Sequence, residues 1–174
     1  MRRERWAHRP GRAATAKAEA LATSLTVREQ VVLPATVDEA WAFLADTPRM
    51  VALDPLLVAY EPERGVIEEG TLNRVTTRIG PLRTTMTSRT EVLDPPSRVV
   101  FASVRPSRPV HVRTEDTLEP LGQGCPYVVT ATLTPTVPVV GQLAARLMAR
   151  AMARSRRELM QRLRSAIAEA DPGA

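Results

Sequence analysis

The sequence predicts one α+β domain in which a curved antiparallel sheet of seven strands wraps round a long C-terminal helix. Three observations support this prediction. Within residues 31–55, a strand end is followed by a capped amphipathic helix and by a second helix that starts at a proline. Residues 56–134 then alternate with a period of two between turn residues, and residues 139–168 have helical periodicity. A sheet that curves round a helix encloses space, so this architecture predicts an internal cavity.

Length and composition indicate how the chain is organised. Its 174 residues are enough for one domain with extensions. We expect residues 1–24 to be a mobile basic extension, residues 25–170 a ligand-binding domain and residues 171–174 a tail. Apolar residues make up 44% and aromatic ones only 3%, so Val, Leu, Ala and Met must fill the core. The single cysteine, Cys125, excludes an intramolecular disulfide.

The charge of the chain is unevenly distributed. Residues 1–24 carry six basic and two acidic side chains, residues 25–138 eleven and fourteen, and residues 139–174 seven and three. No nucleic-acid motif and no aromatic platform accompany the basic ends, so we expect no specific nucleic-acid partner. We interpret the basic ends as solvated, and the alternative is peripheral contact with an anionic membrane through the Arg-rich ends.

The localisation follows from what the chain lacks. No apolar run approaches the roughly 18 residues of a membrane span, and no secretory h-region follows the basic N-terminus. We therefore expect a cytoplasmic protein.

The first strand and the two short helices have clear boundaries. Leu25–Leu33 is rich in β-branched residues and stops at a proline, which is typical of a strand end. Thr36 and Glu39 have the spacing of a capping box, so a helix begins near residue 37. Asp46 followed by Thr47 and Pro48 predicts the start of a second short helix, which ends at Asp54-Pro55.

Six further strands are predicted between these helices and the final one. Turns rich in Gly and Pro separate runs that alternate with a period of two. The predicted strands are Leu56–Tyr60, Thr71–Ile79, Leu82–Leu93, Arg98–Val104, Val110–Leu118 and Tyr127–Thr134.

The last element is a helix of about 30 residues over Val139–Ala168. Its apolar positions cover a wide arc, roughly 220° at 100° per residue, so we expect this face to be buried by a surface that curves round it. These positions are 140, 143, 147, 148, 151, 152, 159, 160, 163 and 167. On another part of the helix, a stripe of arginines is interpreted as a solvated face: Arg146, Arg150, Arg157 and Arg164.

Several segments together resemble a known superfamily: PATVDEAWAFLAD, GTLNRVTTRIG, EVLDPPSRVVF, TLEPLGQG and the final helix. Over residues 25–170 the chain resembles the polyketide cyclase/dehydrase and START-related lipid-transfer (SRPBCC) superfamily. The resemblance implies a helix-grip fold with a deep cavity between the sheet and the last helix. The chain departs from the usual pattern at Leu53, where a Trp often precedes Asp-Pro, and at Cys125-Pro126, where Gly-Thr-Arg usually begins the last strand.

If that fold forms, strand alternation predicts which side chains face the ligand. The expected set is apolar with a band of hydroxyl groups, which suits a hydrophobic ligand with a few oxygen atoms. It consists of Asn73, Val75, Thr77, Thr84, Met86, Ser88, Val112, Thr114, Asp116, Tyr127 and Val129 from strands, with Met148 and Met152 from the helix.

Two residues of this set are candidates for catalysis. Asp116 is its one carboxylate and becomes a general acid or base if burial raises its pKa, although a rim carboxylate paired with an arginine is the preferred interpretation. Tyr127 could donate a proton through its phenol, although we expect a packing residue with its hydroxyl in water.

No other chemistry is indicated. His8, His111 and Cys125 form no metal-ligand cluster, and the chain has neither a nucleophile elbow nor a dinucleotide-binding motif, so we expect no metal and no cofactor. Two functions remain. The first is binding or transfer of a hydrophobic small molecule, either lipid or polyketide-like. The second is an aromatase/cyclase-type enzyme that uses inward polar residues for proton transfer. Whether the chain is an enzyme, and its oligomeric state, are left open.

Overall fold

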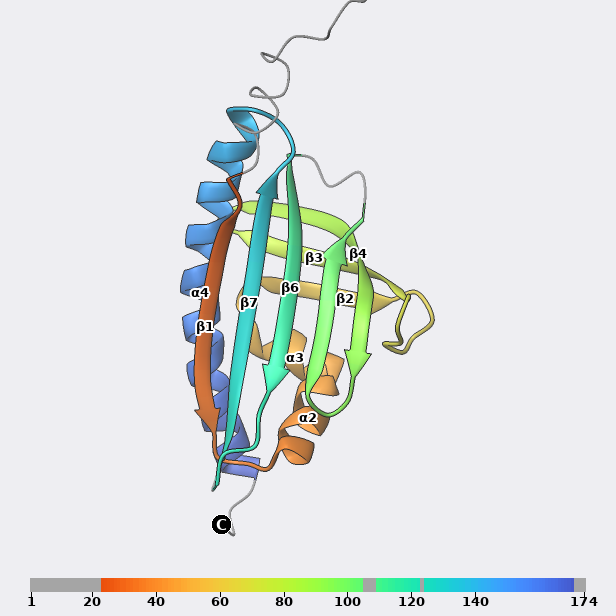
Figure 1. Cartoon of the computed structure of the whole chain (residues 1–174), viewed down its shortest axis with the longest axis vertical. Coiled ribbons are helices and arrows are strands. Elements are labelled where there is room, and N and C mark those ends of the chain that lie inside the picture. The colour runs from red at the N-terminus through yellow and green to blue at the C-terminus, as the bar shows by residue number, and fades with distance from the viewer. Residues whose placement is uncertain (1–22, 105–108, 123, 171–174) are drawn as a thin grey trace, which may run out of the picture.

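The computed structural model describes residues 23–104, 109–122 and 124–170, and it has the predicted α+β architecture (Figure 1). Most of the extension predicted for residues 1–24, and all of the tail at 171–174, lie outside the described residues. The elements are β1 (Leu25–Leu33), α2 (Val37–Ala45), α3 (Thr47–Leu53), β2 (Leu57–Pro62), β3 (Leu72–Ile79), β4 (Leu82–Asp94), β5 (Arg98–Ser103), β6 (Val110–Leu118), β7 (Cys125–Pro135) and α4 (Val140–Ala170).

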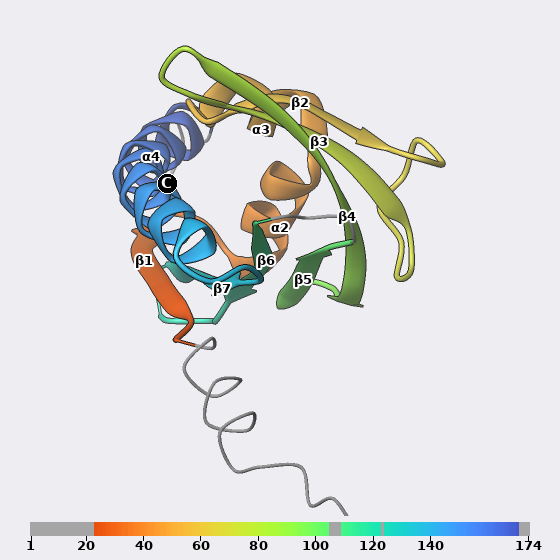
Figure 2. The same ribbon diagram turned by 90° about the horizontal axis from the view of Figure 1, so that it is seen from above.

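The seven strands form one antiparallel sheet in the order β1-β7-β6-β5-β4-β3-β2. Figure 2 shows the strands bending into an open ring, with α4 lying across the gap in that ring. α4 packs mainly against β1, with smaller contacts to β7 and β6. α3 contacts both β2 and α4. This arrangement is the helix-grip fold that the sequence predicted.

The helices after β1 begin where the capping pattern placed them. Glu39 N–H donates to Thr36 Oγ1 at 3.3 Å, and Thr36 N–H donates to Glu39 Oε2 at 2.8 Å, which completes the capping box. The hydrogen bonds from Thr36 lower the pKa of Glu39. At α3, the Arg49 N–H donates to Asp46 Oδ1 at 3.1 Å, so Asp46 is the N-cap. α2 buries Phe43, and Trp41 is partly buried against the same core.

Strand boundaries differ from the predicted ones by one or two residues at several ends. The last strand begins at Cys125 rather than Tyr127, although this places Pro126 inside it. Pro126 is tolerated because it lies near the start of the strand, and its carbonyl still accepts from the Glu119 N–H at 3.1 Å. Val110–Leu118 has the predicted bounds.

The predicted buried face of the last helix is wrong over its first turns. Val140, Leu143 and Leu147 are 62%, 60% and 55% exposed. The helix instead packs through Gly141 and Ala145, which are buried. The packing at Gly141 is close, since a Cβ there would lie 2.9 Å from the Pro109 carbonyl oxygen. The sheet covers only one side of the helix here, so a wide apolar arc cannot be buried whole. No helix in the described ranges is long and apolar enough to span a membrane.

Candidate functional site

Two apolar clusters hold α4 against the concave side of the sheet. One includes Val112, Ala131 and Met152, and the other includes Leu118 and Leu159 together with residues of α2. Polar side chains from α4, from the sheet and from the end of α3 lie next to these clusters. We call them the polar layer, which consists of Asp54, Tyr60, Asp116, Tyr127, Ser155 and Arg156.

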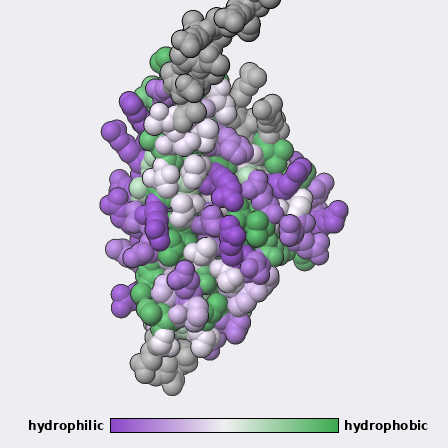
Figure 3. Space-filling view, viewed as in Figure 1, coloured by the Kyte–Doolittle hydropathy of each residue, from purple (hydrophilic) through white to green (hydrophobic). Residues whose placement is uncertain are grey.

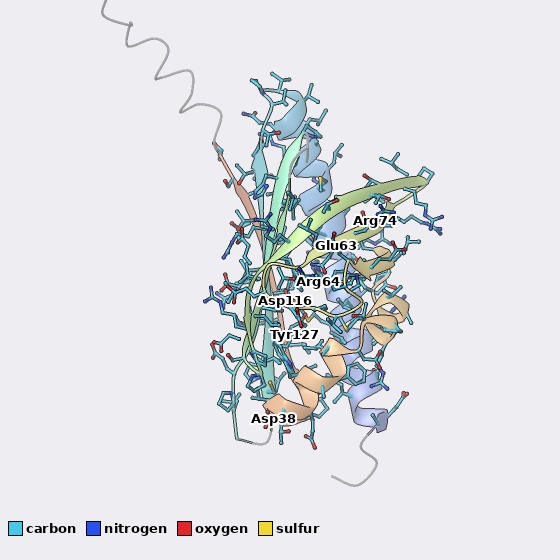
Figure 4. The ribbon with its side chains drawn as sticks, turned by 90° about the vertical axis from the view of Figure 1, so that its right-hand side faces the viewer. Asp38, Glu63, Arg64, Arg74, Asp116 and Tyr127 are labelled. Carbon is cyan, nitrogen blue, oxygen red and sulfur yellow. The ribbon has the colours of Figure 1, made fainter. Side chains whose placement is uncertain are left out.

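Asp116 and Tyr127 meet at the centre of the polar layer, from the neighbouring strands β6 and β7 (Figure 4). The Tyr127 hydroxyl donates to Asp116 Oδ2 at 3.0 Å, and Tyr127 is only 1% exposed. The other carboxylate oxygen, Oδ1, is buried and has no hydrogen-bond partner among the described residues. One carboxylate oxygen of Asp116 is therefore hydrogen-bonded, whereas the other could still bond to a ligand.

The environment of this pair favours its neutral forms. Burial raises the pKa of Asp116, although the charge of Arg156 and the Tyr127 hydrogen bond act in the opposite direction. Burial and the nearby Asp116 raise the pKa of Tyr127 well above its ordinary value, so its phenol stays protonated at neutral pH. A carboxyl group with a raised pKa beside a phenol is suited to proton transfer.

For Asp116 the interpretation preferred from the sequence is wrong, whereas for Tyr127 the expected packing role is confirmed and only the expected position of its hydroxyl is wrong. Asp116 is not an arginine-paired rim carboxylate, because no ion pair involves it in the described part of the chain and its hydrogen-bond partner is Tyr127. The Tyr127 hydroxyl is buried rather than in water. Both side chains face the same way as Val112 and Val129, which is why strand alternation could place them on the concave side.

Asp54 ties the start of β2 to the middle of α4. Its Oδ1 accepts from the Ser155 hydroxyl at 3.2 Å and from the Leu56 N–H at 2.9 Å, and its Oδ2 lies 3.3 Å from Arg156 Nη1. Burial alone would lower the pKa of Arg156, but the carboxylates of Asp54 and Asp116 outweigh it and the net shift is upward. The Nε of Arg156 is buried without a partner among the described residues.

Tyr60 extends the polar layer to the far side of the sheet. Its ring contacts Phe101 edge to face, with centroids 6.1 Å apart. Burial, and then the charge of Asp116, raise the pKa of its phenol. Its hydroxyl is buried and has no partner in the described ranges, as is also true of Asn73 Oδ1 and Ser88 Oγ on β3 and β4. Asn73 and Ser88 are directly opposite each other in the sheet.

Some side chains on the concave side of the sheet keep solvent-accessible surface. Phe101, Thr114 and Ala131 are paired across β5, β6 and β7, so all three face α4. Ala131 is 1% exposed beneath the helix, whereas Phe101 and Thr114 are only half-buried. Solvent-accessible surface therefore remains on the concave side beside the polar layer.

The structure brings most of the sequence-predicted ligand residues to this side. Of the predicted ligand residues, Thr84 alone is exposed; it lies near the β3–β4 turn, opposite Thr77. Among the others, the buried ones are Asn73, Val75, Ser88, Val112, Tyr127, Val129 and Met152, and the half-buried ones are Thr77, Met86, Thr114, Asp116 and Met148.

Four residues of the polar layer were missed by the sequence analysis: Asp54, Tyr60, Ser155 and Arg156. For two of them a signal was present, because Ser155 and Arg156 interrupt an apolar face between Met152 and Leu159 at helical spacing. Asp54 and Tyr60 carried no such signal, since only the tertiary fold brings them to α4 and Asp116. In the described part of the chain, no three His, Cys, Asp or Glu residues are placed to hold a metal ion.

Comparisons with known proteins place the chain in a family. The family described as "Polyketide cyclase / dehydrase and lipid transport" matches residues 24–168. Among solved structures, the Zhui aromatase/cyclase from Streptomyces sp. R1128 is 19% identical with a TM-score of 0.70, over 87% of this chain and 97% of that one.

Two further structures have the same fold. TTHA0849 from Thermus thermophilus is 21% identical with a TM-score of 0.67, over 84% of this chain and 99% of that one. The di-domain aromatase/cyclase StfQ of the steffimycin biosynthetic pathway is 15% identical with a TM-score of 0.70, over 92% of this chain and 55% of that one. The search of curated proteins found no match. Since the family match covers most of the residues, the chain belongs to the polyketide cyclase/dehydrase and lipid transport family.

Proposed function

We propose that the concave side of the sheet binds a hydrophobic small molecule that carries a few oxygen atoms, such as a lipid or a polyketide-like compound. The observation that carries this proposal is the set of buried polar atoms without protein partners on an otherwise apolar surface. These atoms include Tyr60 Oη, Asn73 Oδ1, Ser88 Oγ and Asp116 Oδ1. Leaving such a group unpaired costs about 1–3 kcal/mol, which ligand hydroxyl or carbonyl groups can recover.

The chemistry of these atoms indicates what the ligand presents. A protonated Asp116 and the Tyr60 phenol can each donate to a carbonyl oxygen, and Asn73 Oδ1 can accept from a hydroxyl. The half-buried Phe101 and Met86 offer apolar and aromatic surface nearby. Membership of a family named for polyketide cyclases and lipid transport supports the same class of ligand.

A second function, proton-transfer catalysis of the aromatase/cyclase type, is favoured by one specific observation. The carboxyl group of Asp116 has a raised pKa and is hydrogen-bonded to the Tyr127 phenol, and its other oxygen, Oδ1, is buried without a partner among the described residues. In this proposal Oδ1 of Asp116 exchanges a proton with a folded poly-β-ketone chain, while Tyr127 holds the other oxygen. Two structural neighbours are named as aromatase/cyclases.

The binding proposal is tested with two ligands that differ by one hydroxyl group, 2-naphthol and naphthalene, titrated by ligand fluorescence. We expect 2-naphthol to bind more tightly, and Asp116→Asn or Tyr60→Phe to weaken it by about tenfold, the value of one hydrogen bond to a buried group. Asp38→Asn, an exposed change on α2, is the matched control and should leave the affinity unchanged (Figure 4). Equal affinity for both ligands in all variants would contradict the proposal.

Catalysis is separated from binding with a linear 1,3,5-triketone, in which ring closure gives a new aromatic absorption band. If the second function holds, Asp116→Asn abolishes turnover, while its affinity for the triketone falls by no more than about tenfold, the loss expected for one hydrogen bond. No turnover by the unaltered protein, with binding intact, would leave the binding function alone.

A further inference from the structure

The start of α4 carries a row of apolar side chains that face away from the sheet. Val139, Val140, Leu143 and Leu147 are 76%, 62%, 60% and 55% exposed. Leu143 and Leu147 are four residues apart and lie on the same side of α4. Val139 precedes the helix, and its carbonyl accepts from the Leu143 N–H at 2.9 Å, so Val139 and Val140 lie at the end of the helix next to Leu143. We call these four residues the apolar strip. In Figure 3 hydrophilic side chains project from the edge that α4 forms, and hydrophobic surface lies near the upper end of that edge.

Unpaired arginines flank the apolar strip. Residues 140–157 contain five arginines and no carboxylate. Arg156 is paired with Asp54, and Arg157 with Glu29 at 3.1 Å. The other three, Arg146, Arg150 and Arg154, are exposed and have no ion pair or hydrogen bond to any described residue. Apolar side chains surrounded by free cations match the anionic headgroups and the acyl region of a bilayer surface.

The backbone at Val139 is a second, independent observation. Its φ is 57°, in the left-handed region that a β-branched residue adopts only under strain. A glycine would occupy this position without strain. The chain instead presents an exposed valine here, and strained exposed residues concentrate at sites with a function.

We propose that the apolar strip and Arg146, Arg150 and Arg154 dock the protein on an anionic lipid surface. The charge argues against the N-terminal segment as the occupant, because residues 1–22 carry six basic and two acidic side chains and are repelled by the same arginines. A second copy of the chain is disfavoured for the same reason, since a symmetric contact through this face would bring the arginine rows together. Thr23, just before β1, lines a surface pocket with Gln142 and Arg146, so the start of β1 lies beside the first turns of α4.

The test is co-sedimentation of the full chain with phosphatidylcholine vesicles, with and without phosphatidylserine at roughly one lipid in three. We expect binding only to the anionic vesicles. Changing Arg146, Arg150 and Arg154 to Gln should weaken it by about fivefold per arginine, roughly a hundredfold in all. The double variant Leu143→Ser/Leu147→Ser should weaken it by at least about tenfold.

Matched controls carry the same chemical changes elsewhere on the surface. Arg74, Arg78 and Arg83 are exposed on β3 and β4, so changing all three to Gln removes the same charge away from α4. Leu82→Ser/Leu121→Ser removes two exposed leucines that are 64% and 58% exposed. Thermal unfolding checks that each variant remains folded, which is expected because every altered side chain is exposed.

The outcomes decide between the occupants. Loss of vesicle binding in the α4 variants, with both controls unaffected, supports the proposal. Unchanged binding in the α4 variants would assign the attraction to residues 1–22 and overturn it, as would equal binding to neutral vesicles. A dimer in light scattering that the leucine variant splits, with no vesicle binding, would also overturn it in favour of a second copy.

Discussion

Asp54→Asn should destabilise the protein strongly, because it removes the counter-charge of a buried arginine. The Asp54 side chain is 8% exposed and that of Arg156 17%, and the two are 3.3 Å apart. The substituted amide retains an acceptor oxygen for the Leu56 N–H and for Ser155, so the change isolates the charge. Breaking a buried pair costs about 3–5 kcal/mol, and we expect the lower end because Asp116 also interacts with Arg156. This is a large fraction of a typical stability of about 5–15 kcal/mol.

The assay is urea unfolding at neutral pH, with Asp46→Asn as the control. Asp46 is half-exposed and pairs with Arg49 at 3.5 Å, and Asn is an equally good helix cap, so we expect a loss below about 1 kcal/mol. A double-mutant cycle between Asp54→Asn and Arg156→Met should give a coupling of at least about 1 kcal/mol. A cost for Asp54→Asn as small as the control, or additive effects in the cycle, would refute this account of the polar layer.

Three further predictions concern the pH dependence and local packing. Because burial raises the pKa of Asp116, the folded protein keeps a proton that the unfolded chain loses, so stability is highest below the ordinary carboxyl pKa and falls as the pH rises through the folded one. Asp116→Asn should remove this fall, whose slope is at most about 1.4 kcal/mol per pH unit, and parallel urea-unfolding stabilities of the two proteins across pH would contradict it. Gly141→Ala should destabilise the protein by about 1–3 kcal/mol, because the new Cβ would lie 2.9 Å from the Pro109 carbonyl oxygen, which outweighs the better helix propensity of alanine. An unchanged midpoint of urea unfolding would contradict this, since it would mean that the backbone around Pro109 moves away at little cost. Thr36→Ala should cost about 1 kcal/mol and lower the Tm by roughly 2–4 °C in calorimetry, and a Tm equal to that of the unaltered protein would exclude a stabilising capping box.

Local signals in the sequence were sufficient to predict the fold. The capping box at Thr36 and the turn residues between strands depend on neighbours along the chain, so they could be read directly. Alternation within Val110–Leu118 placed Asp116 on the concave side, since a strand has only two faces. The contact between Asp116 and Tyr127 depends on the register of β6 against β7, and alternation alone does not define that register.

The polar layer and the apolar strip depend on long-range packing, which sequence periodicity does not contain. Asp54 and Arg156 are 102 positions apart and meet only because the end of α3 packs against α4 in the fold. Leu143 and Leu147 have the spacing of a buried face, but the sheet does not reach that side of the helix. Periodicity shows which residues share a face, whereas the tertiary fold decides which face is covered.

Native mass spectrometry of the freshly purified full chain, compared with its denatured mass, tests the central claim most directly. The account predicts a stoichiometric adduct of an apolar, oxygen-bearing compound, or uptake of 2-naphthol in preference to naphthalene when the protein is purified without a ligand. A clean mass of the protein alone, combined with no uptake of 2-naphthol, would contradict the claim that the concave side of the sheet is a small-molecule site.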